Sequence, residues 1–405
     1  MLGFYRMELA AIGGSSRRMR LLVLLLVLMA ELAEPLLAPL EFLALQSMKK
    51  NLHDMPGSNY LSAWDFSKDP CKFPGILCSS SEPQRITTLN LGDPAAGAPG
   101  LRGKLHGALG LLSSLVEFTV APGQLVGPIP ATIAQLGELQ FLGISRNFLS
   151  GSIPAGISAL KKLETLDLSY NQLSGSIPQG IGQLPQLTNL ILARNKLTGP
   201  LPNLSGTSSL LRLDLKQNAL SGTLPSLPSS LKYLALSNNQ LSGGIQNVGH
   251  LSSLTYIDLS FNKFTGIIPS SLLGFHINSL HLQRNSLSGP VQPSAAVNIP
   301  TVDLSYNALN GPISPFFASV QTLYLNNNRF SGAVPRDFAD NLLSAQIQVL
   351  YLQHNYLTQI SIKPSAKLPI STSLCIQYNC MVPPIVSPCP SNAGKQQKRP
   401  SYQCK

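Results

Sequence analysis

The chain has 405 residues, of which 44% are hydrophobic, 12% are charged and 6% are aromatic, and it contains 32 glycines and 32 prolines. This composition argues against a disordered chain and favours a fold that is dense in turns. The formal net charge of +11 allows a polyanionic partner, such as a nucleic acid, an acidic membrane or an acidic polysaccharide.

The N-terminus has the features of a secretory signal. Arg17, Arg18 and Arg20 precede ten apolar residues, 21–30, which are fewer than the ~20 that a helix needs to span a bilayer. Glu31 and Glu34 end this apolar stretch. We therefore expect a signal peptide over residues 1–33, with cleavage somewhere between residues 30 and 38, and secretion to the extracellular space or cell wall. The alternative is an uncleaved anchor that holds the chain at the plasma membrane surface.

Residues 34–84 are predicted to form an N-terminal cap. Their apolar residues recur with the 3-and-4 spacing of a short amphipathic helix, at Leu40, Leu43, Ala44, Met48 and Leu52. The segment W-D-F-S-K-D-P-C-K-F-P-G-I-L-C follows at 64–78, and it places six residues between Cys71 and Cys78. Such a helix would cover the open hydrophobic end of a repeat array.

The middle of the chain repeats one frame, L-x-L-x-x-N-x-L. Its asparagines follow one another at intervals of 24, 24, 23, 21, 23, 23, 22, 21 and 27 residues, at Asn147, Asn171, Asn195, Asn218, Asn239, Asn262, Asn285, Asn307, Asn328 and Asn355. A period of this length with this frame predicts a leucine-rich repeat solenoid, an α/β fold. Two earlier, degenerate copies surround Leu89 and Phe118, so we expect about twelve coils over residues 85–365.

Alternation in L-x-L is typical of a half-buried strand, and successive coils would pair their strands into one parallel sheet. Twelve strands at about 4.8 Å spacing give a face on the order of 50 Å long. The asparagines lie between apolar residues, and buried amides must find hydrogen-bond partners. We therefore interpret them as scaffold residues that bond backbone groups of their own and the adjacent coil.

A glycine–proline signature follows most strands, as in G-S-I-P at 151–154 and 175–178 and G-P-I-P at 127–130, whereas the coils at 243–246, 289–292 and 311–314 lack the proline. The combined pattern L-x-L-x-x-N-x-L-S-G-x-I-P resembles the plant-type leucine-rich repeat of extracellular receptors and cell-wall inhibitors. The cysteine pair resembles the cap of those proteins, W…D-P-C-x-W-x-G-V-x-C, with Phe73 in place of the second tryptophan. The resemblance implies a right-handed superhelix with a parallel concave sheet and disulfide-capped ends.

Residues 366–405 are predicted to form a cysteine-containing C-terminal cap and a basic, proline-rich tail. Four cysteines, Cys375, Cys380, Cys389 and Cys404, lie there, and their three possible pairings stay open. We expect disulfides, because secretion places the chain in an oxidising compartment. A zinc site is the alternative, but the spacings lack the short C-x2-C pairs that zinc prefers.

Charge and glycosylation bear on the partners. Without residues 1–30, which carry four arginines and one glutamate, the charge is +11 − 4 + 1 = +8. Secretion removes nucleic acid from the expected partners, and in a plant wall pectate is the available polyanion. The sequon N-L-S at Asn203 predicts a glycan on the path toward the convex side, which would leave the sheet face free.

The exposed positions of each strand can be predicted by counting back from its asparagine, and we expect positions −6, −4, −2 and −1 to face solvent. The aspartates at −4 (Asp167, Asp214, Asp258 and Asp303) are interpreted as scaffold. Tyrosine and arginine are enriched at binding hot spots. The predicted partner-binding residues are therefore Arg146, Tyr170, Arg194, Tyr233, Tyr256, Phe261, Arg284, Tyr306, Tyr324 and Tyr351.

No catalytic motif is found: H-E-x-x-H, G-x-S-x-G and G-x-x-x-x-G-K-[ST] are all absent from the sequence. We expect no enzyme activity, no cofactor and no metal. The resemblance extends to receptor-like proteins that lack a kinase and to polygalacturonase-inhibiting proteins. It implies a secreted recognition protein that binds a protein or peptide, such as a membrane receptor kinase or a microbial hydrolase, in plant signalling or defence. The alternatives are an inhibitor of a microbial wall-degrading hydrolase and a structural wall protein retained by its charge.

Overall fold

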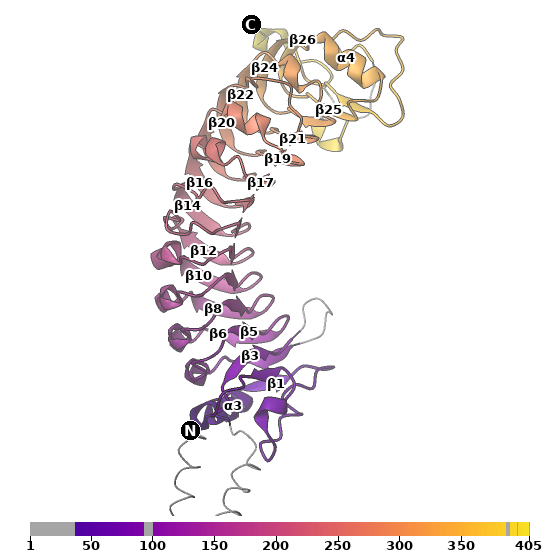
Figure 1. Ribbon diagram of the computed structural model, residues 1–405. Coiled ribbons are helices and arrows are strands. Elements are labelled where there is room, and N and C mark those ends of the chain that lie inside the picture. Colours follow the sequence, from indigo (N-terminus) through magenta and orange to yellow (C-terminus); the bar gives the residue numbers. More distant parts are fainter. Residues whose placement is uncertain (1–36, 93–99, 386–388, 395, 405) are drawn as a thin grey trace, which may run out of the picture.

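A computed structural model describes residues 37–92, 100–385, 389–394 and 396–404. Figure 1 shows a curved stack of coils that runs from the N-terminal to the C-terminal end, with short helices along its outer arc. The predicted α/β leucine-rich repeat solenoid, with disulfides near both ends, is confirmed. The predicted signal peptide, residues 1–33, lies outside the described residues.

The L-x-L segments form the predicted sheet. It has 14 strands, in the order in which they occur in the chain, and each of its neighbouring pairs is parallel except β2 and β3. The strands are β2 (Ile76–Cys78), β3 (Ile86–Asn90), β5 (Glu117–Thr119), β7 (Phe141–Gly143), β9 (Thr165–Asp167), β11 (Asn189–Ile191), β13 (Arg212–Asp214), β15 (Tyr233–Ala235), β17 (Tyr256–Asp258), β19 (Ser279–His281), β21 (Thr301–Asp303), β23 (Thr322–Tyr324), β25 (Val349–Tyr351) and β27 (Ser373–Cys375). These strands lie on the inner side of the curve, so this sheet is the concave face (Figure 1).

A second sheet follows the asparagines, which the sequence analysis did not predict. Its 13 strands are β1 (Leu52–Asp54), β4 (Leu101–Gly103), β6 (Gln124–Gly127), β8 (Phe148–Ser152), β10 (Gln172–Ser176), β12 (Lys196–Gly199), β14 (Ala219–Thr223), β16 (Gln240–Gly243), β18 (Lys263–Gly266), β20 (Ser286–Pro290), β22 (Ala308–Gly311), β24 (Arg329–Ala333) and β26 (Tyr356–Gln359). The glycine of each G-x-x-P signature lies in these strands with a positive φ, as at Gly151 (78°). Glycine tolerates this conformation because it has no Cβ atom.

Short helices cover the outer arc. They are η2 (Gly107–Leu111), η3 (Ala131–Gln135), η4 (Ala155–Ala159), η5 (Gln179–Gln183), η6 (Gln246–His250), η7 (Ser270–Gly274), η8 (Pro315–Phe317) and the α-helix α4 (Arg336–Leu343). The prolines of the signature immediately precede several of them, as Pro154 precedes η4 and Pro335 precedes α4. The fixed φ of proline suits this N-cap position, because the helix makes no hydrogen bond to the backbone nitrogen there.

The asparagines hold consecutive coils together, which confirms their predicted scaffold role. Asn171 is typical: its Oδ1 accepts from the backbone N–H of Leu149 at 3.0 Å, and its Nδ2 donates to the carbonyls of Ile144 at 2.9 Å and Leu168 at 3.1 Å. The backbone of the degenerate coil fits glycine, because a Cβ atom on Gly123 would lie 2.7 Å from the backbone carbonyl oxygen of Leu101 and 2.6 Å from Oδ1 of Asn147. The coil therefore keeps glycine where the frame has asparagine.

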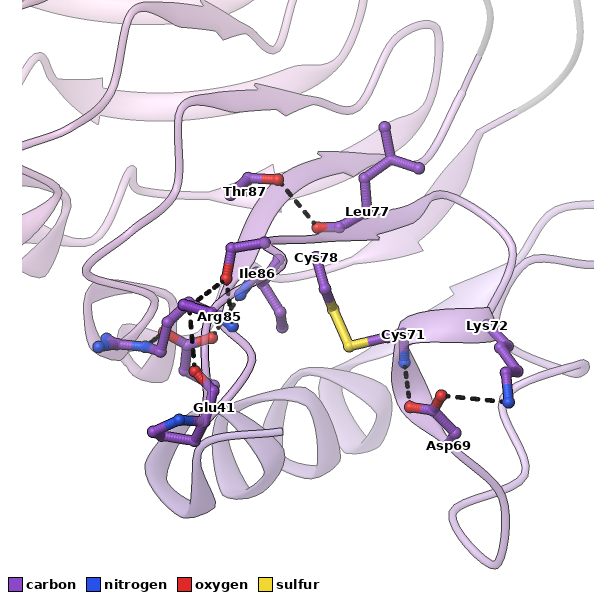
Figure 2. Close-up of a disulfide and its surroundings, with 12 residues drawn as sticks. Glu41, Asp69, Cys71, Lys72, Leu77, Cys78, Arg85, Ile86 and Thr87 are labelled. Carbon is purple, nitrogen blue, oxygen red and sulfur yellow. Dashed lines mark hydrogen bonds and ion pairs between the residues drawn. A yellow bond between two sulfur atoms is a disulfide. The ribbon is translucent and has the colours of Figure 1, made fainter. Parts of the chain in front are cut away.

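The N-terminal cap contains the predicted helix, α3 (Pro39–Asn51), and the disulfide Cys71–Cys78, which joins η1 (Pro70–Lys72) to β2. The predicted buried face was partly wrong, because Leu40 and Leu43 are 62% and 54% exposed. Glu41 is buried instead. Its carboxylate accepts from Arg85 Nε and from the backbone N–H of Ile86, both at 2.6 Å, and this pair of bonds draws the helix onto β3 (Figure 2).

The C-terminal cap continues the repeat before it closes the stack. β27 pairs in parallel with β25, and Asn379 is fully buried. Its Oδ1 accepts from the N–H of Leu357 at 3.0 Å, so it extends the asparagine ladder by one more coil. Of the three open pairings, the structure has Cys375–Cys389 and Cys380–Cys404. These bonded sulfurs are not available as zinc ligands.

Candidate functional site

The position before each asparagine projects from the concave face along one edge of the sheet. From Arg146 to Tyr378, these residues have φ angles between 53° and 58°, which is the left-handed region. This conformation costs on the order of 1 kcal/mol for a residue with a Cβ atom, so packing must hold it in place. Because the backbone turns sharply at position −1, the side chains at positions −1 and −2 point in different directions.

Position −2 is buried in most coils, which corrects the expectation that it faces solvent. The buried residues are Ser145, Ser169, Ala193, Ser237, Ser260, Ser305, Asn326 and Gln353. Three of the five serines hydrogen-bond the aspartate at −4 of their own coil. Oδ1 of Asp167, Asp258 and Asp303 accepts from the backbone N–H and the hydroxyl of the serine two residues later, with hydroxyl contacts of 2.6 Å.

Asp214 is the exception in the −4 position, because residue 216 of its coil is a lysine. Its Oδ2 forms ion pairs with Arg212 at 3.1 Å and Lys216 at 3.6 Å, and the side chain of Asp214 is almost wholly buried. Together with the serine contacts, these bonds confirm the scaffold interpretation of the four aspartates. We call these aspartates the acidic floor of the face.

Arginines and aromatic rings stack on one another at position −1. The guanidinium carbons of Arg146 and Arg194 lie 4.6 and 4.9 Å from the ring centre of Tyr170, which is between them. In the same way, Arg284 lies 5.2 Å from the ring of Phe261 and 4.2 Å from that of Tyr306. We call this row the arginine ridge: Arg146, Tyr170, Arg194, Phe261, Arg284 and Tyr306.

A tyrosine pair occupies the middle of the face. Tyr233 and Tyr256 are opposite each other on β15 and β17, and their rings stack at 4.5 Å with an interplanar angle of 7°. Arg212 lies 4.1 Å over the ring of Tyr233. Burial, and then the nearby Asp258 carboxylate, raise the pKa of Tyr256 to about 12.

The structure brings the ten predicted partner-binding residues into four neighbouring groups. Two groups lie on the ridge, one is the central pair, and the last is Tyr324 and Tyr351, whose rings meet edge to face at 5.2 Å. Sequence reasoning missed Arg212, which completes the central stack, and Tyr378, which stacks with His354 at 4.9 Å. The L-x-I-x-x-N frame at 374–379 was the signal that could have identified Tyr378.

The C-terminal cap covers the end of the face. The backbone carbonyl of Ala393 lies 2.8 Å from Nε2 of His354, and Arg399 lies 4.1 and 4.6 Å over the rings of Tyr356 and Tyr378. Nε of Arg399 also donates to the carbonyl of Asn355 at 3.0 Å. The accessible face therefore ends near Tyr351.

Other kinds of site are not found in the part of the chain that the structure describes. Those residues contain no cluster of three histidine, cysteine or acidic side chains that could hold a metal. No helix among them is long and apolar enough to cross a bilayer. A hollow of about 350 Å³ lies between η8 and α4 on the outer arc, lined by Phe316 and Asp337 among others, and it includes none of the predicted partner-binding residues.

Replacement of Asp303 by asparagine should make the protein more stable at pH 7. Burial raises the pKa of Asp303, with its serine bonds acting in the opposite direction. The folded state therefore binds a proton more tightly than the unfolded chain, and ionisation destabilises it as the pH rises through the folded-state pKa. Asparagine keeps an acceptor for Ser305 without the charge. Unfolding midpoints at pH 7 and pH 3 check this, because the gain should shrink at pH 3; a loss at pH 7 would contradict it.

Asn203 is exposed on the segment between β12 and β13, where its Oδ1 accepts from the backbone N–H of Ser205 at 3.0 Å. A glycan at this residue remains a prediction.

Comparisons with known proteins agree with this geometry. The Leucine rich repeat N-terminal domain family matches residues 38–79, which contain α3 and the Cys71–Cys78 disulfide. Leucine rich repeat families match residues 137–197, 230–251, 253–275 and 319–341. The chain is a leucine-rich repeat protein. No sequence among the curated proteins matches this leucine-rich repeat protein significantly.

Solved structures resemble the protein over most of its length. The plant peptide hormone receptor RGFR1, in complex with RGF2, is 32% identical over 71% of this chain and 47% of its own, with a TM-score of 0.66. PEPR1–AtPEP1 is 27% identical over 84% of this chain and 52% of its own, also with a TM-score of 0.66. The chain thus spans about half the length of these two proteins. A plant ice-binding protein is 26% identical over 82% of this chain and 99% of its own, with a TM-score of 0.53.

Proposed function

We propose that this leucine-rich repeat protein is a secreted recognition protein, which binds a protein or peptide through its concave face in plant extracellular signalling or defence. The observation that carries the proposal is the clustering of arginine and aromatic side chains across neighbouring strands of that face. Aromatic and arginine side chains are the residues that most often dominate binding energy. Cross-strand stacking also fixes their orientations before a partner arrives, which lowers the entropic cost of binding.

The structural relatives support the same assignment. RGFR1, at 32% identity, has been solved in complex with RGF2, and the PEPR1 structure contains AtPEP1. The bonding of the acidic floor argues for recognition rather than catalysis, because its carboxylates are held by serines or by Arg212 and Lys216. A membrane receptor kinase, a free peptide and a microbial hydrolase are all partners that such a face could accommodate.

Replacement of both Tyr233 and Tyr256 by alanine should abolish capture of the partner. Hot-spot residues contribute ~2 kcal/mol or more each, so the affinity should fall at least about 100-fold. The measurement is affinity capture from plant extracellular fluid by immobilised protein, with quantitative mass spectrometry of the bound fraction. Tyr402→Ala is the matched control, because Tyr402 is 73% exposed and lies in the C-terminal cap.

The proposal requires at least one protein or peptide that the wild type and the Tyr402 variant retain and the double variant loses. The identity of that molecule separates signalling from inhibition, since a captured hydrolase can be assayed directly for loss of activity. If the three proteins capture the same molecules in equal amounts, recognition does not take place at the tyrosine pair.

Ice binding is a second candidate, because this chain covers 99% of the plant ice-binding protein but only about half of each receptor. The second sheet presents a row of small hydroxyl side chains, one per strand at about 4.8 Å spacing: Ser150, Ser174, Thr198, Ser221, Ser242, Thr265 and Ser288. Charged side chains at Lys196, Lys263 and Arg329 border this row and interrupt a regular water-ordering surface, so we place this function second.

The two candidates can be separated by measuring ice-grain growth in a frozen sucrose solution. An ice-binding protein would slow growth at micromolar concentration, and Thr198→Lys, in the middle of the row, would weaken the effect while Tyr233→Ala would not. Growth equal to that with the same concentration of serum albumin would remove this candidate.

A further inference from the structure

The arginine ridge indicates the chemistry of the partner. We propose that the ridge binds an extended, anionic polypeptide segment whose acidic side chains are placed three and six residues apart, at i, i+3 and i+9. This inference rests on the proposed function, since it names the class of segment that the concave face would bind.

The arginines of the ridge are the positive charges of the face that lack an ion pair, and Glu117 on β5 is a carboxylate of the same sheet that lacks one among the described residues. Of the acidic floor, Asp214 is paired with Arg212 and Lys216, whereas the other three aspartates are hydrogen-bonded by serines, which fix the carboxylates without neutralising them. In contrast, Arg146, Arg194 and Arg284 are exposed, and among the described residues none of them forms an ion pair or a side-chain hydrogen bond. Their contacts are with aromatic rings, which do not neutralise charge. A partner that complements the ridge is therefore negatively charged.

The stacking also prepares these groups for carboxylates. A guanidinium that lies on a ring keeps its N–H edge free, and that edge can bind a carboxylate with two parallel hydrogen bonds. Tyr170 holds two guanidinium groups, one on each side, and Arg284 lies between Phe261 and Tyr306. Because these rings restrict the arginine rotamers before binding, less entropy is lost when a carboxylate arrives.

The spacing of the coils predicts the register. Arg146 and Arg194 are two coils apart, and Arg194 and Arg284 are four coils apart. At about 4.8 Å per coil these separations are roughly 10 and 19 Å. A polypeptide in the extended polyproline II conformation advances about 3.1 Å per residue with three residues per turn. The two gaps therefore correspond to about three and six residues, and all three acidic side chains face the ridge. The segment would run along the stack, across the strands.

The experiment selects binders from a random 12-residue peptide library on the immobilised full-length protein and reads the enriched sequences. We expect enrichment of aspartate and glutamate, with the separations of three and six over-represented. A synthetic peptide with glutamates at positions 1, 4 and 10 of a glycine–serine background should then bind more tightly than the same composition with glutamates at 1, 2 and 3. The difference should be about tenfold, and it should decrease as salt screens the charges.

Variants assign the effect to the ridge. Arg194→Gln should weaken the spaced peptide about tenfold, and Arg194→Lys, which keeps the charge without the planar fork, should weaken it less. Arg329→Gln is the matched control, because Arg329 is an exposed arginine on the second sheet, and it should leave the affinity unchanged. Circular dichroism of each variant checks the fold.

The possible failures are distinguishable. Enriched peptides that are uncharged or basic, and whose binding depends on Tyr233 and Tyr256 but not on Arg194, would overturn the anionic register and leave the proposed function standing. Equal loss with Arg194→Gln and Arg329→Gln would reduce the effect to net charge and would also overturn the register. No enrichment of any peptide would count against this inference and against peptide recognition by the face.

Discussion

Replacement of Asn262 by alanine should lower the free energy of unfolding by about 3 kcal/mol. Oδ1 of Asn262 accepts from the N–H of Leu241 at 3.0 Å, and Nδ2 donates to the carbonyls of Leu236 at 2.9 Å and Leu259 at 3.2 Å. Alanine leaves the buried N–H of Leu241 without this acceptor, at about 1–3 kcal/mol. It also removes one of the two asparagine donors to each carbonyl, at about 1 kcal/mol each, because Asn239 and Asn285 still donate to them at 3.0 Å. Because coils are stabilised by their neighbours, a break in the middle of the stack weakens both halves. Denaturant unfolding followed by circular dichroism measures the change.

Two further variants test the reason for that loss. Asn262→Asp has nearly the same shape but replaces the donor with a charged oxygen that faces two carbonyls, so it should be at least as destabilising as alanine. Asn247→Ala, at an exposed asparagine in η6 on the outer arc, should change stability by no more than about 0.5 kcal/mol. Equal midpoints for the Asn262 and Asn247 variants would show that the ladder does not hold the coils together.

Replacement of Glu41 by alanine should detach the N-terminal cap, at a cost of about 3 kcal/mol. The Glu41 carboxylate is fully buried and binds both the Arg85 side chain and the backbone N–H of Ile86 (Figure 2). Removal of one partner from a buried ion pair costs 3–5 kcal/mol, and the lower end applies because Arg85 is 33% exposed. Hydrogen exchange of the β3 amides, together with denaturant unfolding, measures the effect.

A conservative variant separates the charge from the hydrogen bonds at this position. Glu41→Gln keeps one oxygen acceptor, so it should lose about half as much stability as the alanine variant. Leu40→Ala, one residue earlier on the same helix but 62% exposed, should have little effect. Wild-type exchange rates at β3 in the Glu41→Ala protein would mean that the aromatic cluster around Trp64 and the Cys71–Cys78 disulfide hold the cap without the ion pair.

The concave sheet and the asparagine ladder could be predicted from the sequence because their pattern has the period of a strand and recurs in every coil. The second sheet could not, because each of its strands has a single buried leucine or phenylalanine, mostly between polar residues and glycine, as in the Gln172–Ser176 strand. The last coil keeps the interval, since Asn379 follows Asn355 by 24 residues. Ile376 and Met381 replace two leucines of its frame, which concealed it.

The residues of the candidate site could be predicted from the sequence, but most of their contacts could not. Counting back from the asparagines selects the residues of the ridge and the tyrosine pair, because register across parallel strands follows from the repeat. The burial of position −2 depends on the left-handed turn at −1, which tyrosine, phenylalanine and arginine do not signal. The packing of Arg399 against Tyr356 and Tyr378 joins the tail to the last coils, and no local pattern indicates such a contact.

The most direct test of the central claim is crosslinking of the secreted protein to its captured partner, followed by mass spectrometry of the linked residues. If the concave face performs recognition, the crosslinks should fall on the strands from β9 to β25 and on the arginine ridge, and they should disappear in the Tyr233 and Tyr256 double variant. Crosslinks confined to the outer-arc helices, the second sheet or the C-terminal tail would contradict it.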